Sequence, residues 1–532
     1  MLTLNKMCSN GDIKSNFNID TNFITTDTKK MRRKRKQEME QINIFNKLQL
    51  TFKLFVWFMS SVVVFISIFY YLYIQSPLKK FDKERIDDER PTYYVLNRNN
   101  DSIDHLKNIF TVLNGIGFRR TYDEANWNLL WSHEYPFLTL APILQNLKPH
   151  QLINHFPGCG YITNKKHLST SGVFYYLPQS FKIPQDKDRF LSHTVLNPNK
   201  LWLKKSNNHR GIKIVKASDI DYNDSESFIQ DFIDNPFLID GYKFDLGVYV
   251  VFTSIDPLRV YIYKGDVLLR FCTIKYEPFD SSQEDSYIIG DEYRPIWEVP
   301  SLNDYYIRLG YSMKDSLYAY MRSIGKDFDN IWNQINKAIQ EIAIMKESLM
   351  KESIQRYGNR RNYFELVRFD FIIDKDMKVH VMEANMSPNL SSAHYPPNQL
   401  LYEQVLFNLF SLIGINPRVK QTRVEKSSET RGQLVHEMEV ASKNLAVLPH
   451  ICTTCHDCLK MECQLCIPCM TEETKHILIQ SYKEHQNKLD FQRIFPPSPL
   501  SQIVLNEYSL QNQLLIKWYQ GKCANDPLWC MS

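Results

Sequence analysis

Hydrophobic and polar positions follow two different periods along most of this chain, which predicts a mixture of strands and helices. Residues 248–253, 258–263 and 267–273 are apolar runs separated by turn residues, and they predict a strand meander. Between 328 and 349, isoleucines recur at three- and four-residue steps, which is typical of a helix with one buried face. Residues 364–390 predict a strand, a turn and a second strand. The fold class that these patterns predict is α/β (α+β).

One apolar run differs from all of these because it continues for 21 residues without a charged residue. It spans residues 54–74, and at about 1.5 Å per residue it is long enough to cross a bilayer core of about 30 Å. Trp57 lies near one end, where interfacial aromatic residues are common. A buried core helix is the alternative. A cleaved signal peptide fits less well, because the run begins far from the N-terminus and no small-residue cleavage site follows it. We therefore expect a transmembrane helix.

Basic residues are more concentrated before this run than after it. The segment KKMRRKRK, residues 29–36, precedes the run, and a charged segment with mixed signs, residues 79–90, follows it. This bias favours a cytoplasmic N-terminus, and thus a single-pass type II protein whose main domain is lumenal or extracellular. A nuclear-type address or a solvated tail is the alternative interpretation of residues 29–36.

The composition is that of a folded protein with no strong net charge. Of the 532 residues, 43% are hydrophobic and 13% are aromatic, and the net charge is only +5. This balance excludes a strongly basic nucleic-acid-binding protein, so no nucleic-acid partner is expected. The predicted organisation is a tail, a transmembrane helix, a charged stalk, a globular region and a polar, cysteine-rich C-terminal part, with these bounds: 1–53, 54–74, 75–91, 92–416 and 417–532.

The predicted hairpin within 364–390 brings three oxygen-bearing side chains together. A turn centred between residues 375 and 376 would place Asp370 opposite Val381, with Glu383 and Asn385 on the same face as Asp370. Two carboxylates and an amide oxygen suit a hard cation such as Mg²⁺. The alternative is an edge strand with solvated acids. Because the first strand is otherwise largely apolar, its acid would be buried and would need a partner, which favours the metal site.

A second group of charged residues could bind phosphate. In the segment KFDLG, period-two alternation puts Lys243, Asp245 and Gly247 on one strand face. Lys205 follows Lys204 immediately before a polar loop, and a lysine beside such a loop could contact phosphate groups, although a solvated lysine pair is the commoner occurrence. Gly247 is unexpected, since a glycine inside a strand offers no side chain to pack.

Together these segments resemble the tubulin–tyrosine ligase-like family of ATP-grasp amino-acid ligases. The similarity extends over about residues 92–415, with 201–416 corresponding to the ATP-grasp core and 92–200 to the part that precedes it. The resemblance implies an ATP-grasp-like core with mixed and antiparallel sheets. It rests on these motifs: NWNLLWS (126–132), INHFPG (153–158), LWLKKSNNHRGI (201–212), the run 228–276 that contains KFDLG, and FELVRFDFIIDKDMKVHVMEANMSPNL (364–390).

The resemblance also implies a reaction. ATP phosphorylates an acceptor carboxylate on a protein, and the amine of a free amino acid then displaces the phosphate. Glutamate is the expected amino acid and tubulin the expected acceptor, as for polyglutamylase-type members, with ATP and Mg²⁺ required. The site residues that the resemblance implies are Lys243, Asp245 and Arg270 for catalysis, Lys205, Arg210, Gly211, Gln230 and Lys243 for ATP, and Asp370, Glu383 and Asn385 for Mg²⁺.

Three positions depart from the family pattern. Gly247 stands where the family usually has an arginine, Asp231 stands where it usually has a lysine, and His209 replaces a glycine of the phosphate loop. Loss of an arginine that faces developing phosphate charge would slow the reaction by orders of magnitude. The alternatives to a tubulin polyglutamylase are therefore an impaired ATP-grasp protein that only binds partners, or a lumenal ligase with a non-tubulin substrate.

Cysteines are concentrated in the C-terminal part. The segment CTTCHDCLKMECQLCIPC, residues 452–469, contains two Cys-x-x-Cys-x-x-Cys repeats, and Cys523 and Cys530 follow. Such spacing suits either Zn²⁺ or disulfides, and the compartment decides between them. A cytosolic domain favours Zn²⁺. The charge bias around residues 54–74 points to a lumenal domain, so disulfides are the expected state.

Overall fold

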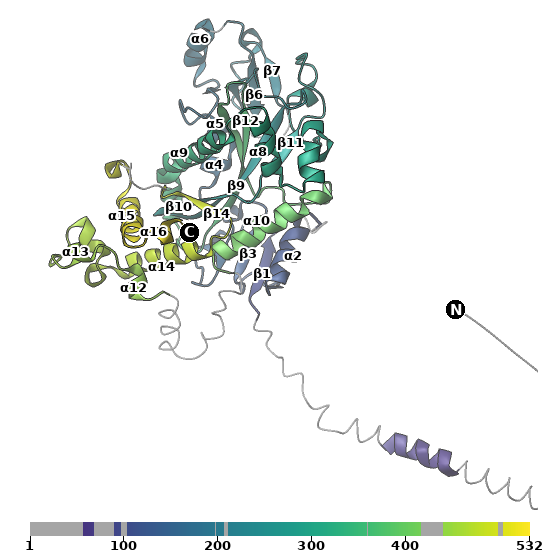
Figure 1. Cartoon of the computed structure of the whole chain (residues 1–532), viewed down its shortest axis with the longest axis vertical. Helices are drawn as coiled ribbons and strands as arrows, with labels where there is room; N and C mark the ends of the chain where they lie inside the picture. The colour runs from purple at the N-terminus through teal and green to yellow at the C-terminus, as the bar shows by residue number, and fades with distance from the viewer. Residues whose placement is uncertain are drawn as a thin grey trace, which may run out of the picture. The chain divides into compact units, whose positions relative to one another are not determined.

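A computed structural model provides the structure of the protein (Figure 1). The structure describes these residues: 57–68, 90–96, 104–196, 198–206, 211–358, 360–415, 440–497 and 504–531. They fall into two compact units, Met1–Glu89 and Arg90–Ser532, each of which is described by itself.

In the first unit, residues 57–68 form a helix whose apolar side chains, including Phe58 and Phe65, are exposed. Within the part of the chain that the structure describes, no helix has the length and apolar character needed to cross a membrane. The rest of the predicted span, residues 54–56 and 69–74, lies outside the described residues, as do the N-terminal tail and most of the predicted stalk.

The second unit begins with a parallel sheet. Its strand order is β2-β1-β3-β4, with bounds β1 Thr92–Leu96, β2 Arg119–Arg120, β3 Leu129–Ser132 and β4 Leu152–Ile153. All three pairings are parallel. A connection between parallel strands needs a crossover, and between β1 and β2 this crossover contains helix α2 (Lys107–Gly115), whose buried face includes Ile109 and Leu113.

A smaller antiparallel sheet carries the lysine pair and Gln230. Its strand order is β5-β8-β6-β7, with bounds β5 Ser180–Lys182, β6 Trp202–Ser206, β7 Lys213–Val215 and β8 Ser227–Asp231. Helix α6 (Lys187–Leu196) supplies Phe190 to a local core with Phe181 and Trp202. This small hydrophobic core holds the sheet together beside the main body.

The central sheet is antiparallel and holds the KFDLG segment. Its order is β13-β12-β9-β10-β14, with β11 also paired to β9; the bounds are β9 Phe244–Ile255, β10 Leu258–Tyr263, β11 Leu268–Phe271, β12 Glu365–Ile373, β13 Val379–Met386 and β14 Phe491–Phe495. The predicted strands are present, but the simple meander is wrong. β11 pairs with the first half of β9 rather than with β10, because β9 is long enough to hold both along one edge.

The β12–β13 hairpin also differs from the predicted register. Asp370 lies opposite Glu383, not opposite Val381, because the register shifts between Asp370 and Phe371. Such a bulge places two residues of one strand against one of the other. Here it brings the two carboxylates directly across from each other instead of diagonally.

Parallel and antiparallel sheets together confirm the predicted α/β (α+β) class.

Helices cover this sheet. The predicted helix is confirmed and extends further, as α9 (Phe328–Ile354), with Ile331, Ile335, Ile339 and Ile342 fully buried, and it contacts β9, β10, β13 and β14. The other helices are α3 Ala141–Leu144, α4 Gly160–Thr163, α5 Lys165–Ser169, α7 Pro300–Asn303, α8 Met313–Ser323, α10 Gln399–Leu412, α12 Ser442–Leu445, α13 Pro449–Cys452, α14 Glu472–Asn487, α15 Leu510–Asn525 and α16 Pro527–Met531.

Within the C-terminal part, strand β14 and helix α14 pack onto the core. β14 extends the central sheet by pairing with β10. In α14, the buried carboxylate of Glu484 accepts hydrogen bonds from Arg259, Tyr261 and Thr253, all on the central sheet. A buried charge needs such partners, so this network attaches α14 to the sheet.

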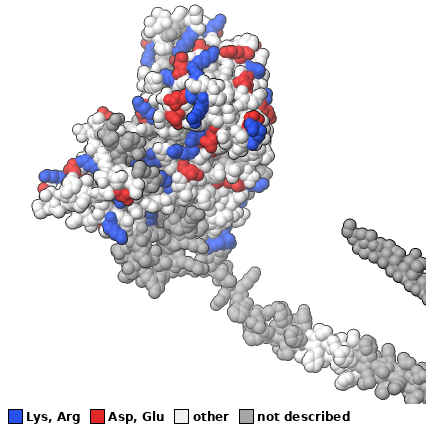
Figure 2. Space-filling view, in the orientation of Figure 1, with Lys and Arg blue, Asp and Glu red and all other residues white. Residues whose placement is uncertain are grey.

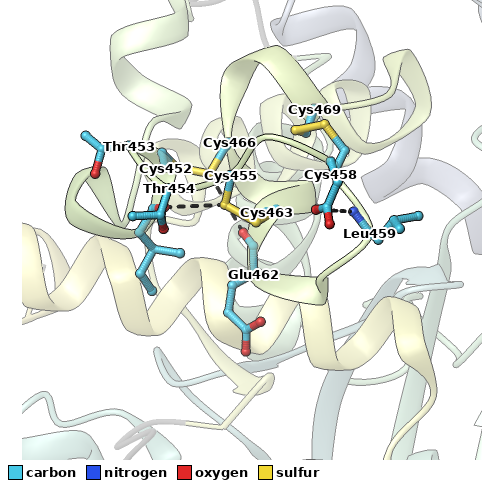
Figure 3. Close-up of a disulfide and its surroundings, with 12 residues drawn as sticks. Cys452, Thr453, Thr454, Cys455, Cys458, Leu459, Glu462, Cys463, Cys466 and Cys469 are labelled. Carbon is cyan, nitrogen blue, oxygen red and sulfur yellow. Dashed lines mark hydrogen bonds between the residues drawn. A yellow bond between two sulfur atoms is a disulfide. The ribbon is translucent and has the colours of Figure 1, made fainter.

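The cysteines of the C-terminal part form four disulfides, which confirms the expected state. Figure 3 shows the cysteines between 452 and 469. The pairs are Cys452–Cys466, Cys455–Cys463, Cys458–Cys469 and Cys523–Cys530. The zinc alternative is wrong in this structure, because zinc needs thiolates and all eight sulfur atoms are paired. Two other cysteines, Cys159 and Cys272, are free and buried.

Candidate active site

The predicted metal ligands meet on one face of the central sheet, as expected. Asn385 Nδ2 donates to Asp370 Oδ2 at 2.9 Å and to Glu383 Oε1 at 3.2 Å. The bulge at Asp370 and the alternation of side chains along β13 put all three polar groups on the same face. The two carboxylates and the amide therefore form a single cluster.

Two arginines share the carboxylate of Asp370. Arg270 Nη2 donates to Asp370 Oδ2 at 2.9 Å, and Arg368 donates to both oxygens, at 2.7 and 2.9 Å. Arg270 also forms a forked pair with Asp245, at 3.0 and 2.7 Å. Burial raises the pKa of Asp245 to about 6, against the opposing effect of Arg270. Arg270 thus bridges the carboxylates of Asp245 and Asp370. Arg368 is an addition that the sequence interpretation missed.

Glu383 has a cationic partner that the sequence interpretation also missed. Lys165, the first residue of α5, places Nζ 2.8 Å from Glu383 Oε2. Burial raises the pKa of Glu383, but the charges of Lys165, Lys205 and Arg368 outweigh it and lower the pKa to about 2. The only available signal was the Lys165–Lys166 pair, which follows the INHFPG motif closely.

Lys205 and Lys243 are both buried in the second unit. Lys205 Nζ donates to Gln230 Oε1 at 2.9 Å, and Gln230 donates to Ser180 Oγ at 3.1 Å. Burial lowers the pKa of Lys205 to about 8, and Lys165 and Lys243 add repulsion that Glu383 opposes. Lys243 Nζ donates to the carbonyl oxygen of Tyr287 at 2.7 Å, and burial lowers its pKa as well. The carboxylates of the site oppose both shifts, since Glu383 raises the pKa of Lys205 and Asp245 raises the pKa of Lys243.

The predicted phosphate loop lies partly outside the described residues, and this includes Arg210 and His209. Gly211 has a φ of +89°, a backbone conformation that favours glycine. At the predicted hinge, Asp231 pairs with Lys200 at 2.7 Å. A cation is therefore present beside position 231, but it comes from a residue outside β8.

A pocket of about 620 Å³ adjoins the carboxylate cluster. Lys165 and Asn385 line it on the side of the cluster, and Tyr135, Tyr161 and His167 line other parts. The pocket thus combines aromatic walls with a cation and an amide. This composition suits a polar ligand that carries a carboxylate.

One other group in the described part of the chain comes close enough to share a metal ion: His155, Cys159 and Glu365, whose ligand atoms lie within 4.8 Å of one another. His155 already hydrogen-bonds Glu365 through Nδ1 and the Ser132 carbonyl oxygen through Nε2, each at 2.8 Å. Burial raises the pKa of the Cys159 thiol well above its ordinary value. A protonated thiol and a fully bonded imidazole make this a structural network rather than a metal site.

The residues of the cluster fit Mg²⁺ and ATP. Two carboxylates and an amide are the oxygen donors that Mg²⁺ takes when phosphates complete its shell. Lys165, Arg270 and Arg368 pair with three carboxylates, those of Asp245, Asp370 and Glu383. The buried Lys205 and Lys243 add two more positive charges, whose pKa values respond to Glu383 and Asp245. The excess of positive charge suits a triphosphate. In contrast, acidic and basic side chains are interspersed over the outer face shown in Figure 2.

Comparisons with known proteins identify the family. Residues 144–423 match the Tubulin-tyrosine ligase family. A probable tubulin polyglutamylase of Caenorhabditis elegans is 41% identical over 76% of this chain and 79% of its own. A tubulin polyglutamylase of Danio rerio and a tubulin monoglutamylase of Homo sapiens are each 29% identical, over 62% and 56% of this chain; the chain spans only 46% and 26% of their lengths. The chain belongs to the tubulin–tyrosine ligase family.

Proposed function

We propose that this protein is an ATP- and Mg²⁺-dependent ligase that adds glutamate to carboxylates of tubulin. The observation that carries the proposal is the cluster of Asp370, Glu383 and Asn385 on one sheet face, bordered by Arg270 and Arg368, in a member of this family. The relatives named as tubulin glutamylases support the choice of amino acid and of acceptor.

The acceptor carboxylate is a poor electrophile until its oxygen takes the terminal phosphoryl group of ATP, which releases ADP. The glutamate amine then attacks the acyl carbon, phosphate leaves, and an amide bond remains. Asp370, Glu383 and Asn385 would hold Mg²⁺, which would neutralise part of the negative charge of the phosphates when bound. Lys205, Lys243 and Arg270 are the residues proposed to face the phosphates, and catalysis then consists of positioning and charge neutralisation.

Two measurements on the full chain test this proposal: calorimetric binding of Mg·ATP, and transfer of labelled glutamate to tubulin. Glu383→Gln should weaken Mg·ATP binding and abolish transfer. Glu277→Gln is the matched control, because Glu277 pairs with Lys375 on the surface, where both side chains are more than half exposed. Binding without transfer would favour the impaired, partner-binding alternative. No binding by the wild-type chain would contradict the ligase proposal.

A second candidate is a lumenal ligase whose acceptor is not tubulin. The four disulfides favour it, because disulfides persist mainly in oxidising compartments, whereas tubulin tails are cytosolic. The uncharged run at 54–74 and the basic segment at 29–36 support a type II membrane anchor that would place the ligase domain in the lumen. Protease digestion of the full chain in sealed microsomes separates the candidates. Protection of the Arg90–Ser532 unit supports the lumenal ligase, and digestion supports the tubulin ligase.

A further inference from the structure

The space above Gly247 is filled by the side chain of Arg368. Gly247 lies in the first half of β9, between Leu268 of β11 and Asp370 of β12. A Cβ atom at position 247 would lie 2.8 Å from Arg368 Cδ, 3.2 Å from Arg368 Nε and 3.2 Å from Leu268 Cβ. The first distance is shorter than real Cβ contacts. Position 247 therefore cannot carry a side chain while Arg368 lies where it does.

Arg368 reaches this space from the neighbouring strand. Its backbone pairs with Tyr249, one step along the face from Gly247, and with Asn385 on the other side. The side chain is only 8% exposed. Its guanidinium forms a two-pronged pair with Asp370, at 2.7 and 2.9 Å. Such forked pairs fix the orientation of the carboxylate as well as its charge.

We propose that Arg368 supplies from β12 the guanidinium that position 247 of β9 lacks, and that it acts as a positioning residue for Asp370 in Mg·ATP binding. The inference rests on the proposed function, since Asp370 is there a ligand of Mg²⁺. It implies that the arginine has been transposed between adjacent strands rather than lost. The reaction then retains a guanidinium at the centre of the sheet face.

A purely structural role for Arg368 does not account for a second buried guanidinium on Asp370. Arg270 already pairs with Asp370, so the carboxylate would keep a cation without Arg368. Burying a second guanidinium on the same carboxylate costs desolvation free energy that stability alone does not require. Among the described residues, Arg368 also adds to the surplus of cations over carboxylates that suits a polyanionic nucleotide.

The test exchanges the two residues. Arg368→Gly should weaken Mg·ATP binding and slow glutamate transfer by about 100-fold, as removal of a preorganised charged donor does. Gly247→Arg alone should also lose binding, because the new side chain clashes with Arg368 and puts a like charge beside it. The double variant Gly247→Arg/Arg368→Gly should recover at least about 10-fold over the worse single variant, since coupled neighbours are not additive.

Two matched arginine-to-lysine substitutions separate a positioning role of Arg368 from a contribution to stability alone. Arg259 on β10 also makes a forked pair with a buried carboxylate, that of Glu484, away from the cluster. Arg368→Lys and Arg259→Lys should lower the melting temperature comparably, but only Arg368→Lys should raise the Mg·ATP dissociation constant. Equal dissociation constants in the two variants would overturn the inference and leave Arg368 as a structural residue.

Failure of the proposed function can be distinguished from failure of this inference. If the wild-type chain binds no Mg·ATP, the ligase proposal fails. In that case the exchange is still tested by melting temperature, because the double variant should be more stable than Gly247→Arg alone. A double variant no more stable than Gly247→Arg would overturn the transposition itself.

Discussion

Replacing Lys205 by methionine is predicted to stabilise the fold and, at the same time, to weaken Mg·ATP binding. Lys205 is 7% exposed, and burial lowers its pKa from 10.5 to about 8. At about 1.36 kcal/mol for each pH unit, this difference corresponds to about 3 kcal/mol of destabilisation when the lysine is charged in both states. Lys205→Met removes that cost but leaves Gln230 Oε1 without its donor, which costs about 1 kcal/mol. At pH 7 the variant should gain about 2 kcal/mol.

The stability difference between Lys205→Met and the wild-type chain should depend on pH. Below pH 8 the lysine is protonated in the folded and unfolded states, and the full cost is present. Between pH 8 and 10.5 the unfolded state binds more protons than the folded state, so the stability of the wild-type chain rises with pH. The advantage of Lys205→Met should therefore shrink above pH 8 and reverse by pH 10.5, to about 1 kcal/mol of net loss.

Urea denaturation of the full chain at pH 7 and at pH 10.5 measures the difference between variant and wild type. Calorimetry at pH 7 should show Mg·ATP binding weakened by about 10- to 100-fold, the value of a charged hydrogen bond to phosphate. Lys204→Met is the control, because Lys204 precedes Lys205 on β6 but pairs with Asp224 at a half-buried position. A Lys205→Met variant that loses stability at pH 7, or whose stability tracks wild type at both pH values, would refute the reasoning.

Three other predictions concern the rest of the second unit. Glu484→Ala leaves Arg259 buried and unpaired and should cost about 3–5 kcal/mol in urea denaturation, whereas Arg259→Met/Glu484→Leu should cost less; an equal loss would contradict the buried-pair explanation. Replacing Cys523 and Cys530 by serine opens a loop with a sequence separation of 7. The unfolding free energy, measured without reductant, should fall by about 2 kcal/mol. An unchanged value would show that this disulfide does not constrain the unfolded chain. The pKa of Glu383 is lowered to about 2, so its carboxylate stabilises the fold above pH 4.5, and this contribution is lost as the pH falls toward 2. Glu383→Gln should therefore flatten the dependence of unfolding free energy on pH in that window, measured by tryptophan fluorescence. An unaltered pH dependence would argue against the Lys165 pair.

Periodicity was sufficient for the parts of the fold that depend on local sequence. The helix at 328–349 and the strands around Gly247 were predicted because one buried face imposes a regular spacing on apolar residues. The pairing of β11 with β9 was not predicted, because short connections favour the neighbouring strand and nothing local marks β9 as long enough for two partners. The bulge at Asp370 was not predicted either, because the alternation of hydrophobic and polar residues does not reveal it.

The candidate site shows the same division. Asp370, Glu383 and Asn385 were found because their spacing on one hairpin is a local property. Lys165 was missed because it reaches Glu383 from a separate helix, over a long sequence separation. Side-chain contacts of this kind depend on tertiary packing, which single-sequence patterns do not encode.

Gly247 shows how a tertiary contact can reverse the interpretation of a single position. Judged from its own strand, the glycine is a deficiency, and an arginine introduced there should restore activity. The structure predicts the opposite for that single change, because Arg368 already fills the space and a Cβ atom would lie 2.8 Å from its Cδ. A similar relation holds at Asp231, where the cation comes from Lys200. On a sheet face, the charge at a given point is set by whichever neighbouring segment reaches it, so a departure from a family motif indicates lost chemistry only when no such neighbour supplies the missing group.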